Sequence, residues 1–148
     1  MHFPGGFPRE ITMTEGTGKV FEYTLTIQEI DLDSFGHLNN AVYLRLFEQA
    51  RWEFITQHGY GIEKIQSTGL GPVILDVHLR FLKELRAREK VVIKSQAVSF
   101  QGKIGKIKQW MEKENTVCAE ALFTIGFWDI RQRKLVSATP DWLACIGL

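Results

Sequence analysis

A carboxylate and a glycine stand in a polar loop directly before a long helix-like segment. The loop contains Asp31, Asp33 and Gly36, and the following segment begins at Asn39 or Asn40. The first N–H groups of a helix are unpaired and carry the positive end of its dipole, so they suit an oxygen that gains negative charge during acyl transfer. The carboxylate of Asp33 is placed to attack a carbonyl carbon or to orient water. From spacing alone this remains a hypothesis, because loop aspartates before helices are more often caps or turn formers.

Alternating apolar and polar residues predict the strands that position this loop. They cover residues 21–27, 72–82, 90–100, 103–111 and 117–128. Gln101-Gly102 and Glu114-Asn115 have the composition of hairpin turns. One strand, one long helix and four further strands, the last three joined by hairpins, indicate an antiparallel α+β sheet rather than βαβ units. A short closing helix is predicted from Thr139 through Cys145.

The long helix is predicted from Asn39 or Asn40, either of which can cap it, to about His58, with Gly59 as the stop. Its apolar residues occupy an unusually wide arc. One stripe consists of Val42, Leu46, Phe47, Ala50 and Phe54, and another side carries Leu44, Trp52 and Ile55. A surface helix needs only one stripe, so the pattern predicts a helix enclosed on several sides by a strongly curved sheet.

The same region resembles a known family signature. The matching residues are Asp33, Gly36, His37, Asn39, Asn40, Tyr43 and Leu44, followed by Phe47, Glu48, Ala50 and Arg51. This run looks like the signature of hotdog-fold thioesterases of the 4-hydroxybenzoyl-CoA thioesterase-like family, in particular their bacterial long-chain acyl-CoA branch. The resemblance implies a curved five-stranded antiparallel sheet wrapped around one central helix. It also implies hydrolysis of a fatty-acyl or aryl-CoA thioester.

By that resemblance, Asp33 takes the position of the catalytic acid, as nucleophile or general base, and the backbone N–H of Asn40 donates to the thioester carbonyl. His37 is a third catalytic candidate. A loop imidazole that fixes the turn is an equally good interpretation of His37. Asn39 is similarly divided between a helix cap and a substrate-binding residue.

The remaining candidates of the region are weaker. Gly36 and Tyr43 are predicted substrate-binding residues, although Tyr43 also fits a core position. Asp31 is interpreted as an exposed loop aspartate rather than as half of a carboxylate pair. Glu48 is a minor alternative catalytic carboxylate. No His and carboxylate cluster has metal-ligand spacing, and no cofactor is expected, because coenzyme A is part of the substrate.

Basic and apolar side chains are available to hold the acyl-CoA. The phosphates of CoA require cations, and the candidates are Lys103, Lys106 and Lys108 on one hairpin and Arg80, Lys83, Arg86 and Arg88 near another strand end. An apolar slot between helix and sheet is predicted for the acyl group. Its candidate walls are Trp52, Phe54, Val73, Leu75 and Phe81. Each of these residues is also an ordinary core or surface residue.

Composition bounds the remaining possibilities. A chain of 148 residues with 45% hydrophobic residues fits one globular domain, predicted over residues 19–148 after a flexible arm at 1–18. A net charge of +1 gives no field for nucleic acid, and no apolar run is long enough for a membrane span. Cys118 and Cys145 are predicted core thiols of a cytoplasmic protein.

The family resemblance implies a homodimer or homotetramer with sites between subunits. Two alternatives to an acyl-CoA thioesterase stay open. One is a non-catalytic acyl-CoA-binding protein of the same fold, because fold alone does not fix function. The other is a thioesterase that acts on acyl-carrier-protein substrates.

Overall fold

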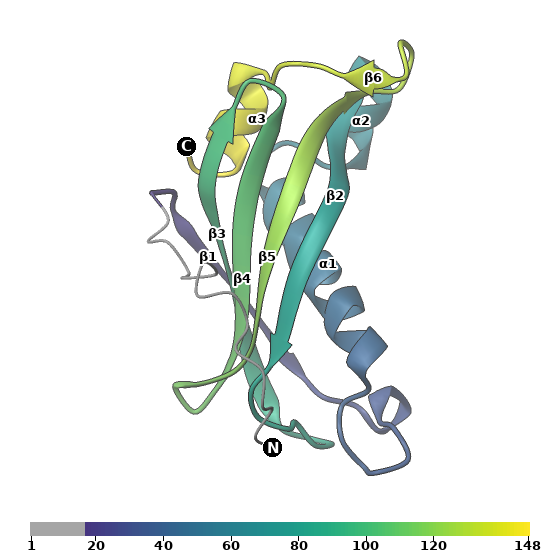
Figure 1. Ribbon diagram of the computed structural model, residues 1–148, viewed down its shortest axis with the longest axis vertical. Coiled ribbons are helices and arrows are strands. Elements are labelled where there is room, and N and C mark those ends of the chain that lie inside the picture. Colours follow the sequence, from purple (N-terminus) through teal and green to yellow (C-terminus); the bar gives the residue numbers. More distant parts are fainter. Residues whose placement is uncertain (1–16) are drawn as a thin grey trace.

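The chain forms an antiparallel sheet that curves along one long helix (Figure 1). The computed structural model describes residues 17–148. In chain order the elements are β1 (Val20–Thr26), the 3-10 turn η1 (Glu29–Asp31), α1 (Asn40–Gln57), α2 (Ile62–Thr68), β2 (Leu70–Phe81), β3 (Lys90–Gln101), β4 (Ile104–Lys113), β5 (Thr116–Asp129), β6 (Lys134–Leu135) and α3 (Pro140–Cys145). The predicted curved sheet around one central helix is confirmed, and the two-residue strand β6 is an addition to it.

The five long strands lie in the order β1-β3-β4-β5-β2, and every neighbouring pair is antiparallel. Both predicted hairpin turns are confirmed. Gly102 has a φ of 61° and Asn115 a φ of 62°, which is the left-handed region that glycine and asparagine tolerate best. β2 is an edge strand, and no other described strand lies on its outer side. This position explains why Pro72, which lacks an N–H, is accommodated within it.

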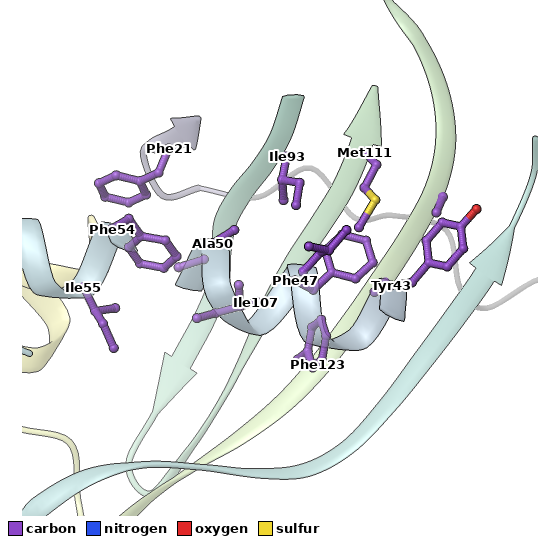
Figure 2. Close-up of a cluster of buried hydrophobic side chains, with 14 of the residues drawn as sticks. Phe21, Tyr43, Phe47, Ala50, Phe54, Ile55, Ile93, Ile107, Met111 and Phe123 are labelled. Carbon is purple, nitrogen blue, oxygen red and sulfur yellow. The ribbon is translucent and has the colours of Figure 1, made fainter. Parts of the chain in front are cut away.

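One face of the sheet packs against α1 to form the core. Side chains on β3, β4 and β5 alternate between buried and less buried positions, as expected for a sheet with one covered face. In Figure 2, Phe54 of the helix lies beside Phe21 of β1, and Phe47 lies beside Phe123 of β5. The rings of Phe47 and Phe123 meet edge to face with centroids 6.1 Å apart. This contact fixes α1 on the concave face of the sheet.

The limits of α1 agree with prediction, and its wide apolar arc is covered only in part within the single chain. Asn39 is the N-cap, and Gly59 beyond the C-terminal end has a φ of 89°. The wide apolar arc predicted a helix enclosed on several sides. In the single chain, however, Leu44 is 38% exposed and Trp52 is 37% exposed. Ile55 on that second apolar side is buried at 3% exposure, so it is Leu44 and Trp52 that face outward.

Two smaller features complete the fold. Both cysteines are buried, as predicted, and burial raises the pKa of the Cys145 thiol to about 11. The helix α2 was not predicted, since it has no buried residue and its first residue, Ile62, is 58% exposed. Within residues 17–148, no helix combines the length and apolar character needed to cross a membrane.

The expected N-terminal arm lies mostly outside the described residues. The description starts at Thr17, and the next residue is already packed. Gly18 is buried, and its N–H donates to the carbonyl of Ala97 on β3 at 3.1 Å. A Cβ at this position would lie 2.9 Å from that same carbonyl oxygen, so the close approach to β3 requires glycine.

Candidate active site

Asp33 forms a tight turn through hydrogen bonds with residues 35–37. Its Oδ1 accepts hydrogen bonds from the backbone N–H of Phe35 at 2.8 Å and of His37 at 3.1 Å. Its own N–H donates to the His37 carbonyl at 2.8 Å, and its carbonyl accepts from Gly36, whose φ is 76°. The other carboxylate oxygen, Oδ2, has no hydrogen-bond partner within residues 17–148. Asp33 therefore forms the turn with one oxygen and leaves the second oxygen unengaged.

The first turn of α1 has one unpaired amide next to this carboxylate. Asn39 caps the helix, since its Oδ1 accepts from the N–H of Ala41 at 2.9 Å and its carbonyl accepts from the N–H of Val42 at 3.0 Å. The N–H of Asn40 has no acceptor in the described part of the chain, and Asn40 is exposed. A ligand oxygen can therefore reach this donor, and the helix dipole favours negative charge there.

His37 lies against a carboxylate that the sequence did not single out. Its Nε2 is 2.8 Å from Oε2 of Glu84, which follows the end of β2. The two loops are also joined by their backbones, because the N–H of Leu38 donates to the carbonyl of Leu85 at 2.7 Å. A hydrogen bond from Arg86, and then the charge of His37, lower the pKa of Glu84. Nothing in the sequence pattern links residues 37 and 84, since Glu84 stands in a run of mixed charges.

Tyr43 stands about one helical turn beyond Asn40. It is only 4% exposed, and its ring packs edge to face on Phe81 with centroids 4.9 Å apart. Burial raises the pKa of Tyr43 to about 12, and the nearby charges of Asp33 and Glu84 act in the same direction. Its hydroxyl group stays protonated at neutral pH and has no partner among residues 17–148. It is a neutral donor close to the Asp33 turn.

Two further carboxylates of the region have other partners. The prediction that Asp31 is exposed is wrong, because Asp31 is 8% exposed and its carboxylate forms an ion pair with Arg45 of α1. This pair and the hydrogen bond from the Asn39 N–H to the Asp31 carbonyl anchor the loop to the helix. Glu48 is exposed and accepts a hydrogen bond from Trp52 Nε1 at 3.4 Å. Glu48 lies two turns along α1 from the unpaired Asn40 amide.

Three of the four cations predicted to hold CoA near the end of β2 are engaged in ion pairs. Arg80 pairs with Glu120, Arg86 with Glu84 and Arg88 with Glu29. Lys83 is exposed and has no ion pair in the described part of the chain. The hairpin between β3 and β4, which carries the three predicted lysines, lies at the end of the sheet opposite the start of α1 (Figure 1). Of the four predicted cations near the end of β2, Lys83 is thus the one without an ion pair within residues 17–148.

Together, the structure brings Asp33, Gly36 and His37 into one turn and places the Asn39 cap and the free Asn40 amide directly after it. A curved sheet around one helix, with a carboxylate at the start of that helix, defines a hotdog-type α+β protein. A model of the thioesterase-like superfamily matches residues 27–146. The chain belongs to the thioesterase-like superfamily, which confirms the predicted relationship.

Curated relatives carry thioesterase names. The chain is 25% identical over 115 residues to the long-chain acyl-CoA thioesterase FadM of Escherichia coli, covering 76% of this chain and 86% of that protein. It is 30% identical over 82 residues to the chloroplast acyl-acyl carrier protein thioesterase ATL3 of Arabidopsis thaliana. That match covers 55% of this chain and only 43% of ATL3. The predicted enzyme class is the class named for these relatives.

Solved structures agree on the fold. A Staphylococcus aureus protein solved in complex with CoA superposes with a TM-score of 0.81 at 17% identity, covering 87% of this chain and 82% of that one. The DHNA-CoA thioesterase of the same organism gives a TM-score of 0.76 at 17% identity, covering 85% and 87%. The predicted hotdog architecture is confirmed.

Proposed function

We propose that this protein is a thioesterase that hydrolyses an acyl-CoA to a free acid and CoA. The observation that carries the proposal is the neighbourhood of two groups without partners, Oδ2 of Asp33 and the backbone N–H of Asn40. An acyl-transfer site requires both an oxygen nucleophile or base and a donor for the developing oxyanion. The thioesterase names of the curated relatives support the same reaction.

In the proposed reaction, the thioester carbonyl oxygen accepts a hydrogen bond from the Asn40 N–H. Asp33 Oδ2 either attacks the carbonyl carbon, giving an anhydride that water then hydrolyses, or takes a proton from an attacking water. In both routes the carbon–sulfur bond breaks, the CoA thiolate leaves and is protonated, and the acyl group departs as a carboxylic acid. The reaction uses no cofactor.

His37 and Tyr43 support this chemistry from either side of Asp33. The contact between Nε2 and Glu84 holds the His37 ring, and the backbone N–H of His37 donates to Asp33 Oδ1. The neutral Tyr43 hydroxyl donates to substrate without adding charge. Lys83 contacts a phosphate of CoA where the 82–89 loop meets the Asp33 turn.

We also propose that the protein works as a homodimer joined through the outer edge of β2. An edge strand presents unpaired backbone groups, and a second copy satisfies them in a symmetric manner. Exposed apolar residues border this edge, since Ile74 is 45% exposed and Phe81 is 51% exposed. Trp52 of α1 also stays exposed in the single chain. A partner seated there covers the outward side of the helix.

An acyl-carrier-protein substrate is the second candidate, because ATL3 is named for that substrate. The test follows thiol release from saturated acyl-CoAs of 8 to 18 carbons, from benzoyl-CoA and from the same acyl groups on carrier protein. Release from acyl-CoAs with at least tenfold higher kcat/KM than from carrier protein supports the proposal. The reverse order favours the carrier-protein enzyme. Binding of acyl-CoA without thiol release in any arm means a non-catalytic acyl-CoA-binding protein.

A further inference from the structure

Two buried polar side chains of the sheet lie beneath the middle of α1. Gln109 of β4 is 0% exposed and Ser95 of β3 is 1% exposed, and the two residues stand directly opposite each other in the pairing of these strands. The rows on either side are apolar, with Ile93 opposite Met111 and Ala97 opposite Ile107. Figure 2 shows Ile93 and Met111 pointing from their strands toward α1. The polar pair therefore interrupts an otherwise apolar surface at the point where the helix crosses it.

Gln109 engages both groups of its side-chain amide. Its Nε2 donates to the backbone carbonyl of Phe47 at 3.0 Å and to Ser95 Oγ at 2.8 Å. Its Oε1 accepts a hydrogen bond from Arg51 Nη1 at 2.8 Å. Phe47 and Arg51 are four residues apart and thus one turn apart in α1. Gln109 therefore holds a single turn of the helix at two points and connects it with β3.

Apolar contacts alone would hold α1 less uniquely. Phe54 stacks on Phe21 with ring centroids 4.5 Å apart, and the hydrogen bond from Gln49 to Tyr23 is exposed to competing water. Apolar packing is non-directional, and cores lose a unique arrangement before they lose stability. Hydrogen bonds impose both a distance and an angle. Stability gives no reason for a buried polar network, because apolar replacements of such networks are often equally stable.

The candidate oxyanion donor lies between two fixed points of the chain. The N–H of Leu38 donates to the carbonyl of Leu85 two residues before Asn40, and Gln109 holds Phe47 about 10 Å farther along the helix, at roughly 1.5 Å per residue. A helix held at one end can pivot, whereas two fixed points define its direction. Alignment matters for the reaction, since a misplacement of about 1 Å can cost roughly a hundredfold in rate.

We propose that Gln109 is a positioning residue, which fixes the direction of the first turns of α1 so that the Asn40 N–H points at the thioester carbonyl beside Asp33. The inference rests on the proposed thioesterase function. Gln109 has no exposed surface and acts only through the Phe47 carbonyl. Its loss should lower kcat more than it changes KM, because the alignment of an oxyanion donor matters most in the transition state.

The test compares two variants of the network with a matched control. Gln109→Glu keeps the acceptor for Arg51 and loses both N–H donors, and Gln109→Met combined with Ser95→Ala replaces the polar pair by apolar groups. Gln96→Met is the control, because Gln96 is on the face of β3 that points away from α1 and donates to the Gly18 carbonyl at 2.6 Å. Thiol release gives kcat and KM, and urea unfolding gives the stability of each protein.

We expect kcat to fall at least about tenfold in both network variants, with KM within about threefold, and to stay within about twofold in Gln96→Met. The variant with Gln109→Met and Ser95→Ala should unfold at no lower urea concentration than the native protein, which separates positioning from a merely structural role. A folded network variant with kcat within about threefold of the native value overturns the proposal. Loss of folding in both network variants also overturns it.

The amide resonance of Asn40 in nitrogen-15 NMR spectra gives a readout that does not need turnover. It should move or split in both network variants and keep its native position in Gln96→Met. A native Asn40 resonance in a folded network variant overturns the proposal. Absence of thiol release by the native protein contradicts the proposed function, whereas the Asn40 resonance still decides the role of Gln109.

Discussion

Nε2 of His37 and Oε2 of Glu84 lie 2.8 Å apart, although His37 precedes α1 in the sequence and Glu84 follows β2. The adjacent backbone bond from Leu38 to Leu85 holds the two loops at this separation. The backbone N–H of His37 also donates to Asp33 Oδ1. The Glu84 carboxylate is therefore connected to the candidate nucleophile through one residue, His37. We therefore propose Glu84 as a positioning residue for this candidate site.

The first prediction concerns Glu84→Gln. Loss of the charge frees the His37 ring, so kcat for acyl-CoA hydrolysis should fall about tenfold, a modest part of the effect of a positioned acid or base. KM should change by less than about twofold, because Glu84 does not contact substrate in the proposed reaction. Steady-state thiol release at several pH values gives both constants and the change in the pH profile.

Glu29→Gln is the matched control for this variant. Glu29 is an exposed glutamate that pairs with Arg88 at 2.7 Å and does not contact His37. Its kcat and pH profile should match those of the native protein. An equal loss of kcat in both variants would show that general surface charge, and not the His37 contact, is responsible.

A second prediction follows from Tyr43. Its pKa is raised to about 12 in the folded protein, whereas an unfolded chain releases the proton near pH 10. Ionisation therefore favours the unfolded chain. The stability of the native protein relative to Tyr43→Phe should be constant below pH 10 and fall by about 2 kcal/mol as the pH rises to 12. Urea unfolding of both proteins between pH 8 and 12 measures this difference, and a flat difference across that range would refute the prediction.

The third prediction tests the helix cap. Asn39→Ala removes the side-chain acceptor of the Ala41 N–H and should reduce the free energy of unfolding by about 1 kcal/mol. Asn39→Asp retains an acceptor oxygen and should lose much less. Urea denaturation of the two variants separates these cases. Equal losses would mean that the Asn39 side chain acts through something other than the cap.

The fourth prediction addresses the proposed dimer. Ile74→Lys places a charge at the outer edge of β2 and should weaken self-association at least tenfold. Ile104→Lys is its control, because Ile104 is 44% exposed, close to the 45% of Ile74, but lies on the interior strand β4. Sedimentation velocity over a range of concentrations measures both. Native protein that sediments as a monomer at all concentrations would rule out the dimer.

The sequence predicted the strands, the long helix and the Asp33 turn because each depends on local patterns. The alternation of apolar and polar residues predicted the strands. The Asp, Gly and Asn residues between 31 and 40 indicated a turn followed by a capped helix. The same pattern could not decide between Asn39 and Asn40 as the cap. The structure assigns the cap to Asn39, and this assignment leaves the Asn40 amide unpaired.

Contacts between distant segments were not predictable in this way. Glu84 meets His37 only because the Leu38–Leu85 backbone bond aligns two loops, and Asp31 is buried only because Arg45 extends from α1 to meet it. The orphaned Trp142 indole is similar, since a tryptophan in a short terminal helix gives no sign of its missing partner. Such contacts depend on the tertiary arrangement and not on sequence spacing.

In the proposed reaction, the free oxygen of Asp33 acts on a carbonyl held by the Asn40 amide. The most direct measurement is thiol release by Asp33→Asn from the acyl-CoA that the native protein hydrolyses best. Asparagine keeps an acceptor oxygen for the Phe35 and His37 amides, so the turn is preserved while the charge is lost. We predict that kcat falls at least about a hundredfold and that KM stays within about threefold. A variant that retains kcat within about fivefold of the native value would show that the Asp33 carboxylate does not carry the reaction.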